Sequence, residues 1–192
     1  MLENKTLVKI CGITSIEQAL QVAELGTNAI GIISVVESPR YISPEKKKEI
    51  FKTLKVLYPN IERVSVVKNR PIDSILKSFL GEPYETIIQL HGDEDIDYCQ
   101  KLKERIPNLA IWKAFRIKKK EDVSKIKPYE NFIDAILLDS WNKDTYGGSG
   151  KRIEQKYLED ISFSKPWWIA GGVSIEWIDE ILKNIKPDGI DI

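Results

Sequence analysis

The chain has 192 residues, of which 42% are hydrophobic and 30% are charged, and its 29 basic residues balance its 29 acidic residues. This length suits one domain with a well-buried core, so we expect a single domain over residues 1–192. The balanced charge predicts no nucleic-acid partner, and the lysine run at 118–120 is followed at once by acidic residues, as in a solvated helix start.

No segment approaches the roughly 20 apolar residues that cross a bilayer, and the amino terminus lacks the layout of a signal peptide. The sequence therefore predicts a cytoplasmic protein without a membrane partner. Two cysteines cannot form a disulfide framework, so we expect Cys11 and Cys99 to be reduced thiols.

Short segments rich in Ile and Val alternate with longer segments of helical periodicity along the whole chain, which is typical of parallel β-strands joined by helices. The strands are nearly continuous apolar runs, as expected where helices cover a sheet. The eight predicted strands span residues 7–11, 29–34, 63–68, 86–91, 110–116, 135–140, 166–170 and 189–192.

Seven helices are expected between the strands, because apolar residues recur there at intervals of three and four residues. The clearest stripe is Ile16, Ala19, Leu20 and Ala23. Helix-start residues agree with this assignment: Ser15 and Ser174 suit N-caps, and Pro44 and Pro71 suit first turns.

Eight strands separated by helices predict an α/β fold, the closed (β/α)8 or TIM barrel, with an open doubly wound sheet as the structural alternative. The sequence stops inside the eighth strand, at Ile192, so we expect a C-terminally incomplete barrel without its eighth helix. The longest irregular stretch spans residues 141–151, and long loops of this kind are often functional.

In such barrels the active site lies at the carboxyl ends of the strands. Cys11 ends the first strand, His91 the fourth and Asp139 the sixth, while Arg40 follows the second and the Gly171-Gly172 pair follows the seventh. These residues are therefore candidates for chemistry on one face of the barrel.

Each candidate also has an ordinary structural explanation. A strand cysteine is more often a small core residue than a base, and Cys99, within a predicted helix, fits that explanation well. Asp139 follows four apolar residues, and it could be a loop cap or a salt-bridge partner. A buried carboxyl that keeps its proton can, however, act as a general acid. His91 is the only histidine, and we expect it to line the pocket.

Two glycine clusters, at 147–150 and 171–172, could bring backbone N–H groups close to a phosphate. Barrels commonly bind phosphate near strands seven and eight, which favours the second cluster. The GGSGK run does not have P-loop spacing, because Thr145 and Arg152 stand where the motif needs Gly and Ser or Thr.

One histidine and two distant cysteines cannot build a usual zinc site, so no metal is expected. No dinucleotide fingerprint follows the first strand either. The simplest expectation is a reaction without a cofactor.

Five motifs in order along the chain, VKICGIT, SPRYIS, IQLHGDE, LLDS followed by YGGSGK, and WIAGGVS, together resemble the phosphoribosylanthranilate isomerase family of tryptophan biosynthesis. The resemblance covers nearly the whole chain. It implies an Amadori rearrangement of N-(5-phosphoribosyl)anthranilate, the expected small-molecule substrate, to 1-(2-carboxyphenylamino)-1-deoxyribulose 5-phosphate, by a monomer or a homodimer.

By the same resemblance, Asp139 is the general acid that protonates the furanose ring oxygen, and Cys11 is the general base that removes the proton at C2. Arg40 of SPRY binds the anthranilate carboxylate, a planar anion that suits a guanidinium. Gly171 and Gly172 hold part of the phosphate. The remaining substrate-binding residues that the resemblance implies are His91 and Gly148.

The sequence departs from the family pattern in GIISVVESPR, which begins in the second strand, in Lys68 on the third strand, and in the absence of an SSGVE-like segment after GIDI. Two alternatives stay open. One is a related barrel isomerase of the histidine pathway, although Cys11 stands where that enzyme has an aspartate. The other is a catalytically weak or truncated barrel that binds a phosphosugar.

Overall fold

The computed structural model describes residues 5–79, 83–140, 152–159 and 161–192. Eight parallel strands form one closed barrel in sequence order, and β8 pairs with β1 to complete it. The strands are β1 (Leu7–Cys11), β2 (Ala29–Ile33), β3 (Glu62–Val67), β4 (Ile87–Leu90), β5 (Ala110–Ile117), β6 (Ala135–Ser140), β7 (Trp167–Ile169) and β8 (Gly189–Asp191). The expected TIM barrel is thus confirmed, and every predicted strand boundary lies within one residue of the observed boundary.

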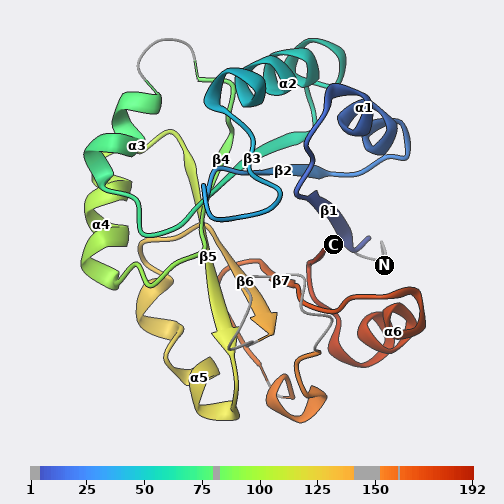
Figure 1. Cartoon of the computed structure of the whole chain (residues 1–192). Coiled ribbons are helices and arrows are strands. Elements are labelled where there is room, and N and C mark those ends of the chain that lie inside the picture. Colours follow the sequence, from blue (N-terminus) through green and yellow to red (C-terminus); the bar gives the residue numbers. More distant parts are fainter. Residues whose placement is uncertain (1–4, 80–82, 141–151, 160) are drawn as a thin grey trace.

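Six α-helices surround the barrel in the described part of the chain (Figure 1). They are α1 (Ile16–Glu24), α2 (Pro44–Leu57), α3 (Ile72–Ser78), α4 (Ile96–Arg105), α5 (Lys120–Ser124) and α6 (Ile175–Glu180), which continues as a π-helical turn, η3 (Ile181–Ile185). Two short 3-10 helices, η1 (Lys127–Tyr129) and η2 (Gln155–Tyr157), complete the connections.

The seventh expected helix differs from the others. Among the described residues between β6 and β7, the only helical element is the 3-10 turn η2. Ile153 and Leu158, which flank this turn, are both buried, and their spacing of five residues does not match one face of an α-helix. Residues 141–151, which include the expected functional loop, lie outside the described residues.

The helix starts follow the capping chemistry of the sequence. Ser15 accepts a hydrogen bond from the Gln18 backbone N–H, and Ser43 caps α2 with Pro44 at its first position. Pro71 is the N-cap residue of α3, one position before the expected first turn. Ser174 is the N-cap residue of α6, but its hydroxyl accepts a hydrogen bond from Arg152 instead of from the helix.

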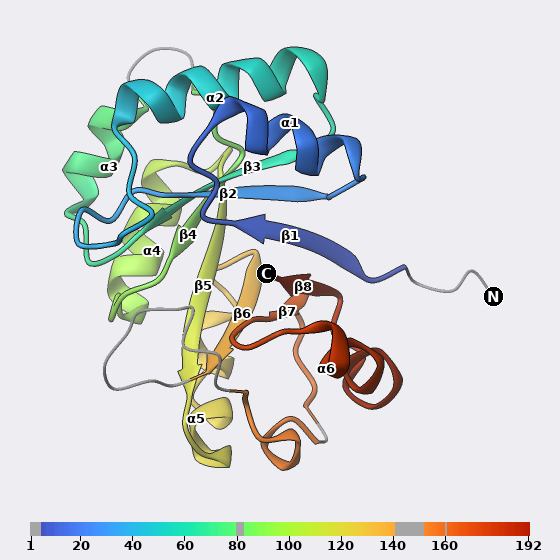
Figure 2. The same ribbon diagram turned by 45° about the vertical axis from the view of Figure 1, so that its right-hand side comes forward.

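Alternation along the strands separates two apolar layers. One buried cluster contains only residues of strands or strand ends and fills the inside of the barrel, with Trp112 and Trp168 in tilted contact at 4.7 Å between ring centroids. Two further clusters combine outward-facing strand residues with helix residues. Figure 2 shows the chain end beside β1 and β8, where the barrel closes.

No helix in the described ranges is long and apolar enough to cross a membrane.

Candidate active site

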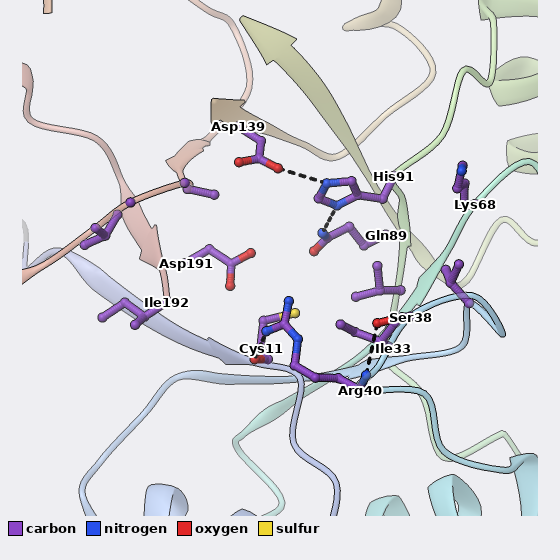
Figure 3. Close-up of a pocket in the computed structure, with 16 residues that line it drawn as sticks. Cys11, Ile33, Ser38, Arg40, Lys68, Gln89, His91, Asp139, Asp191 and Ile192 are labelled. Carbon is purple, nitrogen blue, oxygen red and sulfur yellow. Dashed lines mark hydrogen bonds and ion pairs between the residues drawn. The ribbon is translucent and has the colours of Figure 1, made fainter. Parts of the chain in front are cut away.

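A cavity of about 320 Å³ opens at the carboxyl ends of the strands. Cys11, Arg40, His91, Asp139, Gly171 and Gly172, which are six of the seven residues predicted from the sequence, all line it. The seventh, Gly148, lies outside the described residues. Figure 3 shows Asp139 and Cys11 on opposite walls of this cavity, with Asp191 between them.

Cys11 is held by backbone contacts on both sides of β1. Its N–H donates to the Ile192 carbonyl at 2.7 Å, and the following Gly12 N–H donates to the Gly31 carbonyl at 2.8 Å. Gly12 adopts φ of +89°, a conformation that glycine accepts readily and that turns the chain out of the strand. The residue as a whole is partly exposed, and it ends the strand at the cavity wall.

The environment of the Cys11 sulfur contains opposing charges. Burial raises the pKa of the Cys11 thiol above its ordinary value, while the ammonium of Lys9 and the guanidinium of Arg40 act to lower it. The carboxylate of Asp191 adds to the increase. The thiolate that a general base needs therefore depends on the cations beside it.

A buried ion pair lies below Cys11. Lys9 Nζ donates to Asp191 Oδ2 at 2.7 Å, and the side chain of Lys9 has no exposed area. The second carboxylate oxygen, Oδ1 of Asp191, is buried and has no hydrogen-bond partner among the described residues. Asp191 is also a lining residue of the cavity, so the buried ion pair lies directly beside the site.

Asp139 ends β6 and is 4% exposed. Its Oδ2 lies 3.1 Å from Nε2 of His91, and Nδ1 of His91 lies 3.0 Å from the amide nitrogen of Gln89 (Figure 3). A Cβ atom at Gly171 would lie 2.6 Å from the other carboxylate oxygen, Oδ1. The bare backbone of Gly171 is therefore what makes room for Oδ1.

Arg40 reaches the cavity from the loop between β2 and α2. Its Nη1 donates to the Cys11 carbonyl at 3.2 Å, and a Cβ atom at Gly12 would lie 2.6 Å from the same Nη1. The guanidinium is thus positioned by the backbone of β1 and by the missing side chain of Gly12. Its other N–H groups can grip a planar anion in the cavity.

The glycine turn after β7 forms another part of the wall. Gly171 and Gly172 have φ of +79° and +64°, in the left-handed region where side chains other than glycine are strained. Both residues line the cavity. A turn of this kind can present backbone N–H groups to an anion.

Four lining or supporting residues were not among the sequence-based candidates: Lys9, Gln89 and Asp191 are buried, and Lys68, noted only as a departure from the family pattern, lines the cavity. The first three are polar residues in otherwise apolar strands, at positions that alternate with outward-facing residues. A polar residue at an inward-facing position of an apolar strand is the sequence feature that could have identified these three residues. Which of them meet depends on the closure of β8 onto β1, which the sequence does not specify locally.

The site thus offers an ionisable thiol, a buried carboxyl group on the opposite wall, a guanidinium and a glycine turn. Such a set can transfer protons within a bound anionic substrate. No group of three or more His, Cys, Asp or Glu residues with the geometry of a metal site occurs in the part of the chain that the structure describes.

Comparisons with known proteins agree on one family. The family model described as N-(5'phosphoribosyl)anthranilate (PRA) isomerase matches residues 8–192. An N-(5'-phosphoribosyl)anthranilate isomerase from Trichodesmium erythraeum is 40% identical over 178 residues, which is 92% of this chain and 76% of that relative.

Two solved structures have the same fold. One shows monomers of the dimeric phosphoribosylanthranilate isomerase from Thermotoga maritima, with a TM-score of 0.77, 29% identity, and coverage of 98% of this chain and 87% of that one. The other is a phosphoribosylanthranilate isomerase in complex with reduced 1-(o-carboxyphenylamino)-1-deoxyribulose 5-phosphate. It has the same TM-score, identity and coverage values.

Proposed function

We infer the roles of the site residues from one premise: the chain belongs to the N-(5'-phosphoribosyl)anthranilate isomerase family and is an isomerase of tryptophan biosynthesis. The substrate of this reaction carries an aromatic carboxylate, a ribose ring and a phosphate. The cavity has to bind two anions at its ends and move protons at the ribose between them.

The observation that carries the proposal is the placement of Cys11 and Asp139 on opposite walls of one cavity, at the ends of β1 and β6. A base and an acid on opposite sides of a substrate can act on two atoms of the same ring without exchanging protons directly.

In the first step, Asp139 gives a proton to the ring oxygen of the ribose. The bond between this oxygen and C1 breaks, its electron pair goes to the oxygen, and the nitrogen lone pair forms a C1–N double bond, so that a protonated Schiff base results. Oδ2 of Asp139 is engaged by His91, so Oδ1, which lies beside Gly171, is the oxygen that delivers the proton.

In the second step, the thiolate of Cys11 removes the proton from C2, which the adjacent iminium acidifies. The S–H bond forms, the C2–H bond breaks, and the electron pair forms a C1–C2 double bond while the C1–N double bond becomes single. The resulting enolamine tautomerises to the ketose product.

Binding groups are assigned to the two ends of the substrate. We assign the anthranilate carboxylate to Arg40, because a guanidinium can hold it with two parallel hydrogen bonds. The backbone of Gly171 and Gly172 receives part of the phosphate. His91 contacts the substrate beside the acid, and Gly148 is proposed as a further contact from residues 141–151.

The test is conversion of freshly made phosphoribosylanthranilate by the wild-type chain and by Cys11→Ala and Asp139→Asn. Loss of a positioned acid or base lowers the rate by about 100- to 10,000-fold. Cys99→Ala and Asp97→Asn are matched controls on α4, and both should keep wild-type activity. Full activity of Cys11→Ala or Asp139→Asn would contradict the assigned roles.

The alternative of a catalytically weak, phosphosugar-binding barrel predicts a different result in the same assay. It requires that the wild-type chain bind the reduced product analogue, measured by calorimetry, while turning over substrate no faster than Asp139→Asn.

We further propose that the protein works in the cytoplasm without a nucleic-acid partner, as a monomer or a homodimer. The metabolic role supports this location, and the Thermotoga maritima relative is described as dimeric with monomeric forms. Light scattering at several protein concentrations distinguishes the two oligomeric states.

A further inference from the structure

Lys9 is a charged residue inside the barrel that the proton transfers described above do not use. It precedes Cys11 by two positions on β1, so strand alternation points both side chains into the barrel. Lys9 is fully buried, and Asp191, its register partner on β8, lies at 2.7 Å. Burying an ammonium costs free energy because the charge loses its hydration, and only an opposite charge or hydrogen bonds offset this cost.

Gly31 brings the Lys9 ammonium and the Cys11 sulfur together. It is the register partner of Cys11 on β2. A Cβ atom at Gly31 would lie 2.7 Å from Sγ of Cys11 and 3.2 Å from Nζ of Lys9. Both atoms therefore border one point on β2, and Gly31 contributes no side chain to separate them.

We propose that Lys9 is a positioning residue for the reaction, that its ammonium stabilises the thiolate form of Cys11, and that Asp191 sets how much of this positive charge acts on the sulfur. The inference rests on the proposed role of Cys11 as the base. It assigns a function to the buried pair beyond joining β1 to β8.

The charged groups around the sulfur support this assignment. Burial is the largest influence on the pKa of Cys11 and raises it, Lys9 lowers it, Asp191 raises it and Arg40 lowers it. Burial raises the pKa of the Asp191 carboxyl, and among the smaller influences His91 lowers this pKa and Asp139 raises it. Lys9 is the cation with the strongest lowering effect, so it is the residue whose removal should shift the titration most.

A purely structural role for Lys9 makes a different prediction. If the pair only ties β8 to β1, its loss lowers stability but leaves the titration of Cys11 unchanged. Lys47 is a suitable control, because it forms another largely buried ion pair, 2.7 Å from Glu85, and reaches Ser65 from α2, outside the cavity.

The experiment measures the rate of iodoacetamide alkylation of Cys11 as a function of pH. The chain has two cysteines, and Cys99→Ala leaves Cys11 as the single thiol. Cys99 itself is buried, which raises its pKa to about 12. Lys9→Met, Asp191→Asn and Lys47→Met are each added to this background, and folding is checked by circular dichroism.

The proposal predicts that Lys9→Met moves the alkylation midpoint up by about one pH unit, which makes the reaction about tenfold slower at a fixed pH below the midpoint. Asp191→Asn moves the midpoint down, and Lys47→Met leaves it in place. An unmoved midpoint in folded Lys9→Met, or an upward shift in Asp191→Asn, would overturn the proposal.

The double variant Lys9→Met/Asp191→Asn keeps the test decisive if Lys9→Met does not fold, because it leaves no unpaired charge in the barrel. Its midpoint should be higher than that of Asp191→Asn, and equal midpoints would again overturn the proposal. The readout needs no substrate. A failure of the base role would instead appear as full turnover by Cys11→Ala, so the two failures are distinguishable.

Discussion

Nε2 of His91 lies 3.1 Å from Oδ2 of Asp139, and the tautomer of the imidazole decides which of these atoms donates. Nδ1 of the same ring faces the amide nitrogen of Gln89 at 3.0 Å. An amide nitrogen only donates, so Nδ1 accepts, and the ring proton of neutral His91 belongs on Nε2. We therefore expect His91 to donate to Oδ2 and to orient the carboxyl group, which leaves Oδ1 for the proposed contact with the substrate.

The first prediction concerns this tautomer. Nitrogen-15 NMR of the free enzyme, at a pH where His91 is neutral, should show the Nε2–H form. Because the chain has a single histidine, both ring signals belong to His91, and their couplings to the two carbon-bound ring protons tell Nδ1 from Nε2. Gln89→Leu removes the donor to Nδ1 and should yield a mixture of tautomers. A dominant Nδ1–H form in the wild type would contradict the orienting role of His91.

The second prediction concerns Arg40 and the space that Gly12 leaves for it. Arg40→Lys should raise KM by about tenfold or more with a smaller effect on kcat, since a hydrogen bond to a charged group contributes about 1.5–3 kcal/mol. Gly12→Ala should act in the same direction, because the new Cβ would meet the Arg40 side chain and φ is +89°. Steady-state kinetics give both constants. Arg105→Lys, an exposed change at the end of α4, should leave them unaltered, and a fall in kcat alone for Arg40→Lys would rule out carboxylate binding.

The third prediction concerns stability. Lys9→Met leaves Asp191 as an unpaired buried carboxylate and should lower the free energy of unfolding by about 3–5 kcal/mol, as measured by urea denaturation near neutral pH. Lys9→Met/Asp191→Asn should recover a large part of this loss. If the single variant were as stable as the wild type, the ion pair would contribute nothing to the free energy of unfolding, which would contradict this prediction.

The pH dependence of this contribution follows from the titration of Lys9. Burial alone would lower the pKa of Lys9, but Asp191 and Cys11 raise it above its ordinary value of 10.5. The folded state thus holds this proton more tightly than the unfolded state. The stabilisation is fully present below the ordinary lysine value and is lost as the pH rises above it. Wild-type stability should therefore fall more steeply than that of Lys9→Met above about pH 10.5.

The sequence predicts the barrel and the rim of the site for one physical reason. Buried parallel strands leave continuous apolar runs, and a polar residue at the end of such a run, such as Asp139, stands out. The same rule does not identify the buried ion pair of Lys9 and Asp191 below Cys11. Lys9 lies within LVKIC and Asp191 within GIDI, and neither segment shows that the two strands pair across the barrel closure.

Other features depend on tertiary context in a similar way. A cysteine at a strand end can be either a base or a small core residue, so the position of Cys11 does not assign its role. The ordered motifs are what suggest it. Among the described residues between β6 and β7, a 3-10 turn stands in place of the expected helix, with the buried residues Ile153 and Leu158 on either side of it. Arg40 is placed by its contact with the backbone of β1, 29 positions earlier in the chain.

The most direct test of the acid and base roles is the isotope effect at C2 of the ribose. Turnover of phosphoribosylanthranilate carrying deuterium at C2 should show a clear primary isotope effect in Cys11→Ser, because removal of the C2 proton becomes the slow step. Asp139→Asn should show none, because ring opening then limits the rate before C2 reacts. The reverse pattern, with the isotope effect in Asp139→Asn and none in Cys11→Ser, would contradict the assignment of Cys11 as base and Asp139 as acid.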